Sequence, residues 1–197
     1  MVNTKMENLK HGYLEIILGP MFSGKTSKLI EIYKQYTFCD MDVLVINHSA
    51  DTRYANTEMY THDQKHIDCI HTSKLRCVID ENIDKFTKSQ APLAVLINEG
   101  QFFPDLYDSV YEMVNQHKVH VYVAGLDGDF KQEKFGQMLD LIPLCDKVYK
   151  LHSLCLYCKN GSKAIFSHKK DATNQSQIQI GSDNLYVPLC RFCIQSF

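Results

Sequence analysis

The sequence of 197 residues lacks both the long apolar segments of a membrane protein and the charge excess of a nucleic-acid-binding protein. No apolar run approaches the ~18 residues of a membrane span, and residues 1 to 10 lack the apolar block of a signal peptide. The formal net charge is −2, whereas a dedicated DNA- or RNA-binding domain is usually basic. We therefore expect a cytoplasmic protein that has neither a membrane nor nucleic acid as its partner.

Disulfide bonds are also expected to be absent, although the chain has eight cysteines. Disulfide frameworks belong to oxidising compartments, and a cytoplasmic chain offers thiols or metal sites instead. Four cysteines stand alone in the sequence and are interpreted as small core residues: Cys39, Cys69, Cys77 and Cys145. With 45% hydrophobic residues the chain can form one ordinary globular domain with a small appendage.

A glycine-rich stretch matches the phosphate-binding pattern G-x-x-x-x-G-K-[ST]. Its residues are Gly19, Pro20, Met21, Phe22, Ser23, Gly24, Lys25 and Thr26. A buried strand is predicted before it at residues 13–18, and apolar residues recur at helical spacing after it. In this context backbone N–H groups face phosphates, Lys25 reaches the outer phosphates, and the Thr26 hydroxyl binds magnesium. A chance glycine turn before a helix is the competing interpretation.

Polar residues follow two further predicted strands at the edge where open α/β sheets bind ligands. Asp51 and Arg53 follow the strand predicted at 43–46, and the strand at 93–97 runs into Asn98 and Glu99. The second placement is that of a Walker B strand, where a following carboxylate can activate the nucleophile. A solvated ion pair for Asp51 and Arg53, or a helix-capping role for Glu99, would be the structural alternatives.

The remaining elements complete an α/β pattern. Helices are predicted at about 75–86 and 104–117, and strands at 119–124 and 147–151. Aromatic residues near the ligand edge could wall a pocket, although many such residues simply belong to the core. They are Phe102, Phe103, Phe130 and Phe135.

Two C-x-x-C pairs near the end of the chain predict a zinc site. The four ligands would be Cys155, Cys158, Cys190 and Cys193. Neither pair lies at a helix start after a βαβ pattern, which disfavours thioredoxin-like redox motifs. Because four thiolates leave no open coordination position, the zinc would be structural. The long insert at 159–189 is predicted to form a hairpin from 164–167 and 177–180 and to act as a lid held at its base.

These motifs resemble those of thymidine kinases of the cytosolic and poxvirus type, over nearly the whole stretch from Tyr13 to Cys193. The matching motifs are GPMFSGKT at 19–26, DTRY at 51–54, EGQFFPD at 99–105, LDGDF at 126–130 and the two C-x-x-C pairs. The resemblance implies a RecA-like P-loop α/β core at 13–151 with a mainly parallel sheet, after a flexible arm at 1–12. It also implies a C-terminal zinc domain at 152–197, a lasso at about 168–187 and a homotetramer.

By position, the resemblance also assigns roles to single residues. Glu99 would take the proton from the thymidine 5′-hydroxyl, and Arg53 would stabilise charge on the transferred group. The ATP site would contain the glycine loop and also Asp51, Thr52, Arg53, Asn98, Glu99, Gly100 and Gln101, with magnesium on Thr26. The nucleoside site would contain Met21, Phe102, Leu126, Phe130, Phe135, Ser167, Gln177, Ile178, Gln179, Ile180, Gly181 and Tyr186. The resemblance also implies that deoxyuridine is phosphorylated, that the reaction is a salvage step for DNA synthesis, and that thymidine triphosphate inhibits the enzyme.

Two features depart from the family pattern. Asn98 stands where the family usually has an aspartate, so we expect retained activity with weaker or altered magnesium dependence. The chain also ends four residues after Cys193, which we interpret as a sign of origin in a large DNA virus.

Other function classes fit the sequence less well. A P-loop switch or motor ATPase would be regulatory, yet no N-K-x-D guanine-reading motif or coupled domain occurs. A nucleoside monophosphate kinase needs an arginine clamp for the second phosphate, and the chain has only Arg53, Arg76 and Arg191. A zinc-ribbon nucleic-acid module is disfavoured by the near-neutral charge.

Overall fold

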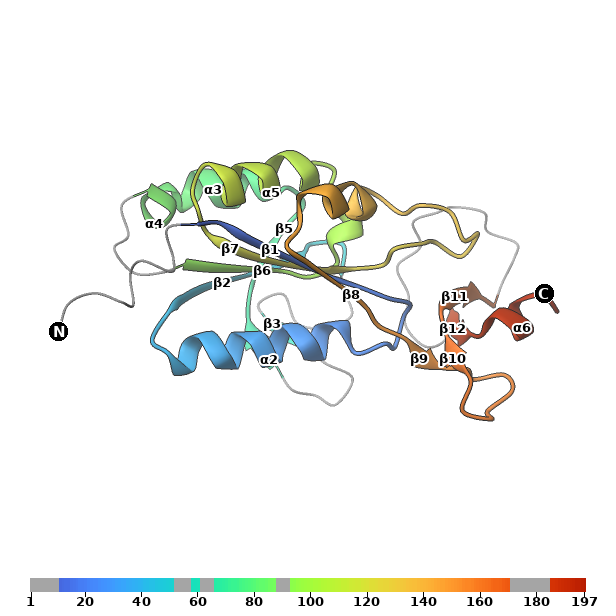
Figure 1. Ribbon diagram of the computed structural model, residues 1–197. Coiled ribbons are helices and arrows are strands. Elements are labelled where there is room, and N and C mark those ends of the chain that lie inside the picture. Colours follow the sequence, from blue (N-terminus) through green and yellow to red (C-terminus); the bar gives the residue numbers. More distant parts are fainter. Residues whose placement is uncertain (1–10, 52–57, 61–65, 88–92, 171–184) are drawn as a thin grey trace.

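The computed structural model describes residues 11–51, 58–60, 66–87, 93–170 and 185–197. Its main feature is a six-stranded parallel sheet of strand order β5-β2-β6-β7-β1-β8 (Figure 1). The strands are β1 (Tyr13–Leu18), β2 (Asp42–His48), β5 (Ile70–Thr72), β6 (Leu93–Ile97), β7 (His120–Gly125) and β8 (Lys147–Lys150). Five of them confirm the predicted strands. The sequence pattern missed β5 because this strand is short and follows a polar segment.

Helices cover both faces of the sheet (Figure 1). Helix α2 (Lys25–Phe38) lies on one face. The other face carries α3 (Leu75–Glu81), α4 (Ile83–Thr87), α5 (Leu106–Asn115) and the 3₁₀ helix η2 (Met138–Leu144). The helix predicted at 75–86 is broken at Asn82, whose side-chain nitrogen donates to the Val78 carbonyl oxygen at 3.0 Å and ends the first segment.

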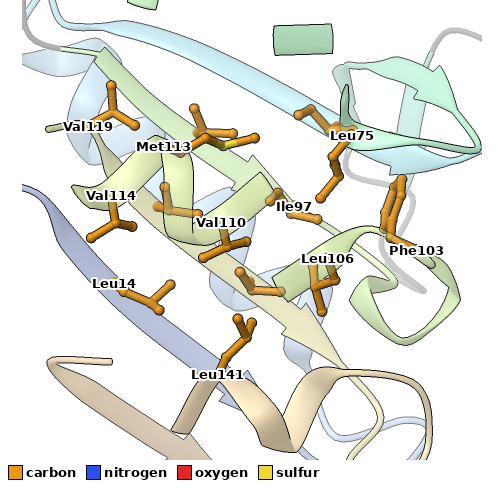
Figure 2. Packing of buried hydrophobic residues seen from close by; sticks show 14 of the residues in the cluster. Leu14, Leu75, Ile97, Phe103, Leu106, Val110, Met113, Val114, Val119 and Leu141 are labelled. Carbon is orange, nitrogen blue, oxygen red and sulfur yellow. The ribbon is translucent and has the colours of Figure 1, made fainter. Parts of the chain in front are cut away.

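The alternation of side chains along the strands produces two apolar layers. Leu14, Ile16 and Leu18 of β1 join the cluster beneath α3 and α5, whereas Ile17 joins the cluster beneath α2. Figure 2 shows the first cluster, in which Leu106, Val110 and Met113 of α5 pack toward the strands. All five residues of β6 are buried because both faces of this central strand are covered.

A small region follows β8 at one end of the sheet (Figure 1). It contains β9 (Ser153–Leu154), β10 (Lys163–Ala164), β11 (Phe166–Lys169), β12 (Tyr186–Leu189) and α6 (Arg191–Ile194). Strand β9 pairs with β10, and β11 pairs antiparallel with β12. The hairpin partner predicted for residues 164–167 was 177–180, which lies outside the described residues. The described partner of Ser167 is Pro188 instead.

Short strands β3 (Glu58–Tyr60) and β4 (His66–Asp68) form a separate antiparallel pair that the sequence did not predict. The core assignment of the isolated cysteines is wrong for Cys39 and Cys77, which are exposed. No helix within the described ranges is long and apolar enough to span a membrane.

Candidate active site

The glycine loop lies between the end of β1 and the start of α2. Gly24 has a φ of 84°, and Phe22 is held at a φ of 63°, which is costly for a residue with a side chain. A Cβ atom at Gly19 would approach the Leu151 carbonyl oxygen to 2.8 Å. No side chain of the described residues caps the N-terminus of α2, a helix end whose first N–H groups suit an anion.

Two side chains in this loop suit a phosphate group. Lys25 folds over the loop and its Nζ atom donates to the Pro20 carbonyl oxygen at 2.8 Å. The Ser23 Oγ atom is buried and has no hydrogen-bond partner among the described residues. Buried polar atoms are rarely left unpaired, so a hydroxyl in this state fits a loop that receives an oxygen-rich ligand.

A chain of buried polar side chains starts beside this loop. The Thr26 hydroxyl lies 3.5 Å from Asn98 Oδ1, and Asn98 Nδ2 donates to Asn47 Oδ1 at 3.1 Å. Asn47 Nδ2 in turn donates to Asp51 Oδ2 at 3.2 Å. Thr26, Asn98 and Asp51 are site residues predicted from the sequence, whereas Asn47 was not predicted. Its position at the carboxyl end of β2, directly before the predicted polar segment, was the available signal.

Glu99 follows Asn98 and sits in a strained backbone conformation, with a φ of 55°. Gln101 Nε2 donates to Glu99 Oε2 at 2.6 Å, while Gln101 Oε1 accepts from the Leu126 N–H group at 2.9 Å. Gln101 is only 4% exposed and belongs to the 3₁₀ helix η1 (Gly100–Phe102). It therefore fixes the Glu99 carboxylate to the turn after β7.

An aromatic group lies next to Glu99. The ring centroids of Phe102 and Phe135 are 5.5 Å apart in an edge-to-face arrangement, and His48 lies 5.6 Å from Phe102. Phe103, in contrast, is a core residue that is 1% exposed, so its proposed place in a pocket wall is wrong. Leu126 and Phe130 are partly exposed near the same edge.

His48 is a second residue near this edge that was not predicted from the sequence. Burial lowers the pKa of this imidazole, although the nearby Glu99 carboxylate opposes the shift. His48 Nδ1 accepts from the Ala50 N–H group at 3.1 Å. The neutral ring that this contact requires carries its proton on Nε2.

The small region reaches the glycine loop through Ser167. Its Oγ atom accepts a hydrogen bond from the Met21 N–H group at 2.9 Å, which brings together residues 146 positions apart. Lys169 is buried, with its Nζ atom 4.9 Å from the centroid of the Phe130 ring. Burial raises the pKa of Tyr186, and the Asp129 carboxylate raises it further. The structure thus places four predicted nucleoside-site residues around one region: Met21, Phe130, Ser167 and Tyr186.

The four cysteines of the two C-x-x-C pairs come together in the small region. Their Sγ atoms all lie within 4.8 Å of one another, and Cys155, Cys190 and Cys193 are buried. The Cys193 N–H group donates to Cys190 Sγ at 3.5 Å. This set of sulfur donors fits a tetrahedral zinc ion, which would be enclosed by protein ligands. The predicted ligand set is therefore confirmed as a cluster that could bind a metal.

Other predicted site residues lie outside the described part of the chain. They are Thr52, Arg53, Gln177, Ile178, Gln179, Ile180 and Gly181.

Comparison with known proteins shows similarity to thymidine kinases over nearly the whole chain. Residues 12–194 match the family model described as thymidine kinase. The chain is 37% identical to the thymidine kinase of sheeppox virus (strain KS-1) over 188 residues, which cover 94% of this chain and 98% of that protein. It is also 37% identical to the variola virus thymidine kinase and 36% identical to that of vaccinia virus (strain Western Reserve). Each of these alignments covers 92% of this chain and 96% of the relative.

Proposed function

Because the chain belongs to the thymidine kinase family, we propose that it transfers the γ-phosphoryl group of ATP to the 5′-hydroxyl group of thymidine and of deoxyuridine. The observation that carries this proposal is the position of Glu99. Glu99, whose backbone is strained, follows β6 at the sheet edge that also holds the glycine loop, and Gln101 fixes its carboxylate in place. A phosphate-binding loop and a positioned carboxylate are the two parts that such a transfer needs.

In this proposal the chain divides the work between two sets of residues. The N–H groups of the loop and Lys25 hold the triphosphate, and Arg53 stabilises the charge that is transferred. Glu99 accepts the proton of the 5′-hydroxyl as its oxygen attacks the γ-phosphorus. The bond from the γ-phosphorus to the oxygen that bridges it to the β-phosphorus breaks, and ADP leaves.

Magnesium fits the residues at the loop. Thr26 Oγ1 and Asn98 Oδ1 are uncharged oxygen atoms 3.5 Å apart, and oxygen is the ligand type that this ion prefers. When bound, the ion would neutralise charge on the phosphates. Asn98 contributes no negative charge of its own, which supports a weaker magnesium dependence than an aspartate would give.

The nucleoside would lie between the aromatic residues and the small region. Met21, Phe102, Leu126, Phe130, Phe135, Ser167 and Tyr186 would surround it. The backbone of residues 177–181 would recognise thymine, and the lasso at about 168–187 would close over the site. The zinc on the four cysteines would hold the base of this lasso and would take no part in the reaction.

We extend the proposal to the biology of the enzyme. It would work as a homotetramer in the cytoplasm of a host cell, supply thymidine monophosphate for DNA synthesis and be inhibited by thymidine triphosphate. The poxviral origin of the similar proteins supports the viral setting.

A labelling assay tests the central claim. The purified protein is incubated with γ-labelled ATP, magnesium and, separately, thymidine, deoxyuridine, deoxycytidine and thymidine monophosphate. We expect label in thymidine and deoxyuridine monophosphates. Phosphorylation of deoxycytidine or of thymidine monophosphate, without product from thymidine, would overturn the proposal.

A further inference from the structure

The buried side chains of Asp51, Asn47 and Asn98 connect the end of β2 with Thr26, the proposed magnesium ligand. They are 6%, 2% and 3% exposed, so water does not readily replace the hydrogen bonds that join them. The Asn98 N–H group also donates to the Ile46 carbonyl oxygen at 2.8 Å, which ties the end of β6 to β2. The three side chains are therefore held in one line by two neighbouring strands.

The direction of these hydrogen bonds follows from chemistry. A carboxylate only accepts hydrogen bonds, so Asn47 must turn its NH₂ group toward Asp51. Its carbonyl oxygen then faces Asn98, whose NH₂ group is the side-chain group of Asn98 that can donate to it. The Asn98 oxygen is left to face Thr26. The Asp51 carboxylate thus determines, through the Asn47 carboxamide, that the Asn98 oxygen rather than its NH₂ group faces Thr26.

We propose that Asp51 and Asn47 are positioning residues that present the Asn98 oxygen to the magnesium ion or to a water on it. The inference rests on the proposed function, because it assigns these residues a role in binding the metal–nucleotide substrate. It explains how asparagine can serve at this position. A carboxylate offers an oxygen whichever way it turns, whereas a carboxamide turned by 180° would present an NH₂ group and repel a cation.

The alternative role for Asn47 is simple structural support of the two strands. A structural role and a positioning role give different results when Asn98 is replaced by aspartate. If Asn47 only supports the strands, Asn47→Leu should weaken metal binding equally in both backgrounds. If it orients the carboxamide, its loss should matter with asparagine at position 98 and should hardly matter with aspartate there.

The experiment measures Mn²⁺ binding to the full-length protein with ADP by electron paramagnetic resonance. We expect Asn47→Leu to weaken Mn²⁺ binding about tenfold or more, as is usual for groups that orient a metal ligand. Asn98→Asp combined with Asn47→Leu should bind Mn²⁺ as Asn98→Asp alone does. ADP affinity in the presence of a chelator should be unchanged, and Asn115→Leu, the same change at an exposed residue, should bind Mn²⁺ normally.

If Asn47→Leu fails to fold, Asp51→Asn provides a second route because it keeps the size of the side chain. It replaces the carboxylate, which only accepts hydrogen bonds, with a carboxamide and so allows the Asn47 and Asn98 side chains to turn. Mn²⁺ binding should again weaken more in the Asn98 background than with Asn98→Asp. Equal effects in the two backgrounds, or unchanged Mn²⁺ binding in Asn47→Leu with thymidine phosphorylation intact, would overturn this inference alone. Failure of the native protein to bind Mn²⁺ with ADP would overturn it together with the proposed function.

Discussion

The α/β core and the small cysteine region are stabilised in different ways. The core buries two apolar layers against its sheet, one of which includes Leu14, Val110 and Leu141 (Figure 2). The buried cluster of the small region consists of Cys155, Ala164, Leu189, Cys190 and Cys193. Among the described residues, its buried members other than cysteine are an alanine and a leucine, and the partly buried Val187 and Ile194 pack against them. A region this small cannot offset its loss of conformational entropy by apolar burial alone and needs a metal or another cross-link.

In the proposed function, the two regions nevertheless contribute to one site. The core would provide the glycine loop, Asn98 and Glu99, whereas the small region would provide Ser167 and Tyr186. The hydrogen bond from Met21 to Ser167 joins them directly. We infer that the catalytic geometry depends on the core and that substrate enclosure depends on the metal-held region.

Loss of the metal should have the largest effect, and it should be confined to the small region. Structural zinc can contribute ~10–16 kcal/mol to folding, more than this region's apolar cluster can replace. We expect chelation, or Cys193→Ser, to expose residues after β8 to proteases and hydrogen exchange while the sheet stays protected. Hydrogen-exchange mass spectrometry measures both regions at once.

A matched control for this experiment is Cys39→Ser, since Cys39 is an exposed cysteine far from the cluster in sequence. This variant should keep protection in both regions. If the core and the small region lose protection together after chelation, the proposed independence of the core is wrong.

Replacement of Glu99 should reduce activity without reducing the stability of either region, because it removes the proposed general base and leaves the fold in place. Glu99→Gln keeps the side-chain shape, and a glutamine carbonyl oxygen can still accept from Gln101 Nε2. Loss of a general base typically reduces kcat by about 10²–10⁴. Steady-state kinetics with thymidine should show this decrease, while calorimetry shows unchanged ADP affinity.

The exposed Glu31 provides the control for Glu99. Glu31→Gln removes a surface ion pair with Lys28 and should leave kcat unchanged. A kcat for Glu99→Gln within a few-fold of the native value would show that this carboxylate is not the base.

Ser167→Ala should have a smaller effect, on the connection between the two regions. The change leaves the Met21 N–H group without its side-chain acceptor, at a cost of about 1–3 kcal/mol if water cannot replace it. We expect an increase in the KM for thymidine with a smaller change in kcat. Ser162→Ala in the small region serves as the control, and an unchanged KM in Ser167→Ala would indicate that the hydrogen bond does not shape the nucleoside site.

The sequence predicted the core better than the site's connections, for physical reasons. Continuous apolar residues predict a buried strand such as β6, and the glycines of the loop allow the positive φ found at Gly24. The C-x-x-C spacing likewise predicts the cysteine cluster. Asn47 and His48 have no such pattern, because their importance arises only when β2 and β6 lie side by side. The hydrogen bond from Met21 to Ser167 crosses 146 positions and leaves no local signal.

The smallest expected effect is a dependence of stability on pH, and it separates the two regions again. Burial lowers the pKa of His48 and His120 in the core and of His168 in the small region below the ordinary 6.5. Between each folded-state pKa and 6.5 the unfolded chain binds more protons, so stability is greatest above pH 6.5 and falls as the pH drops through this window. Hydrogen exchange at several pH values should show the decrease in both regions.

Two variants assign this pH dependence to single histidines. His168→Gln should reduce the pH dependence of the small region only, and His48→Gln should reduce that of the core in part, since His120 remains. An identical pH dependence in the native protein and both variants would show that these imidazoles are not buried in their neutral form.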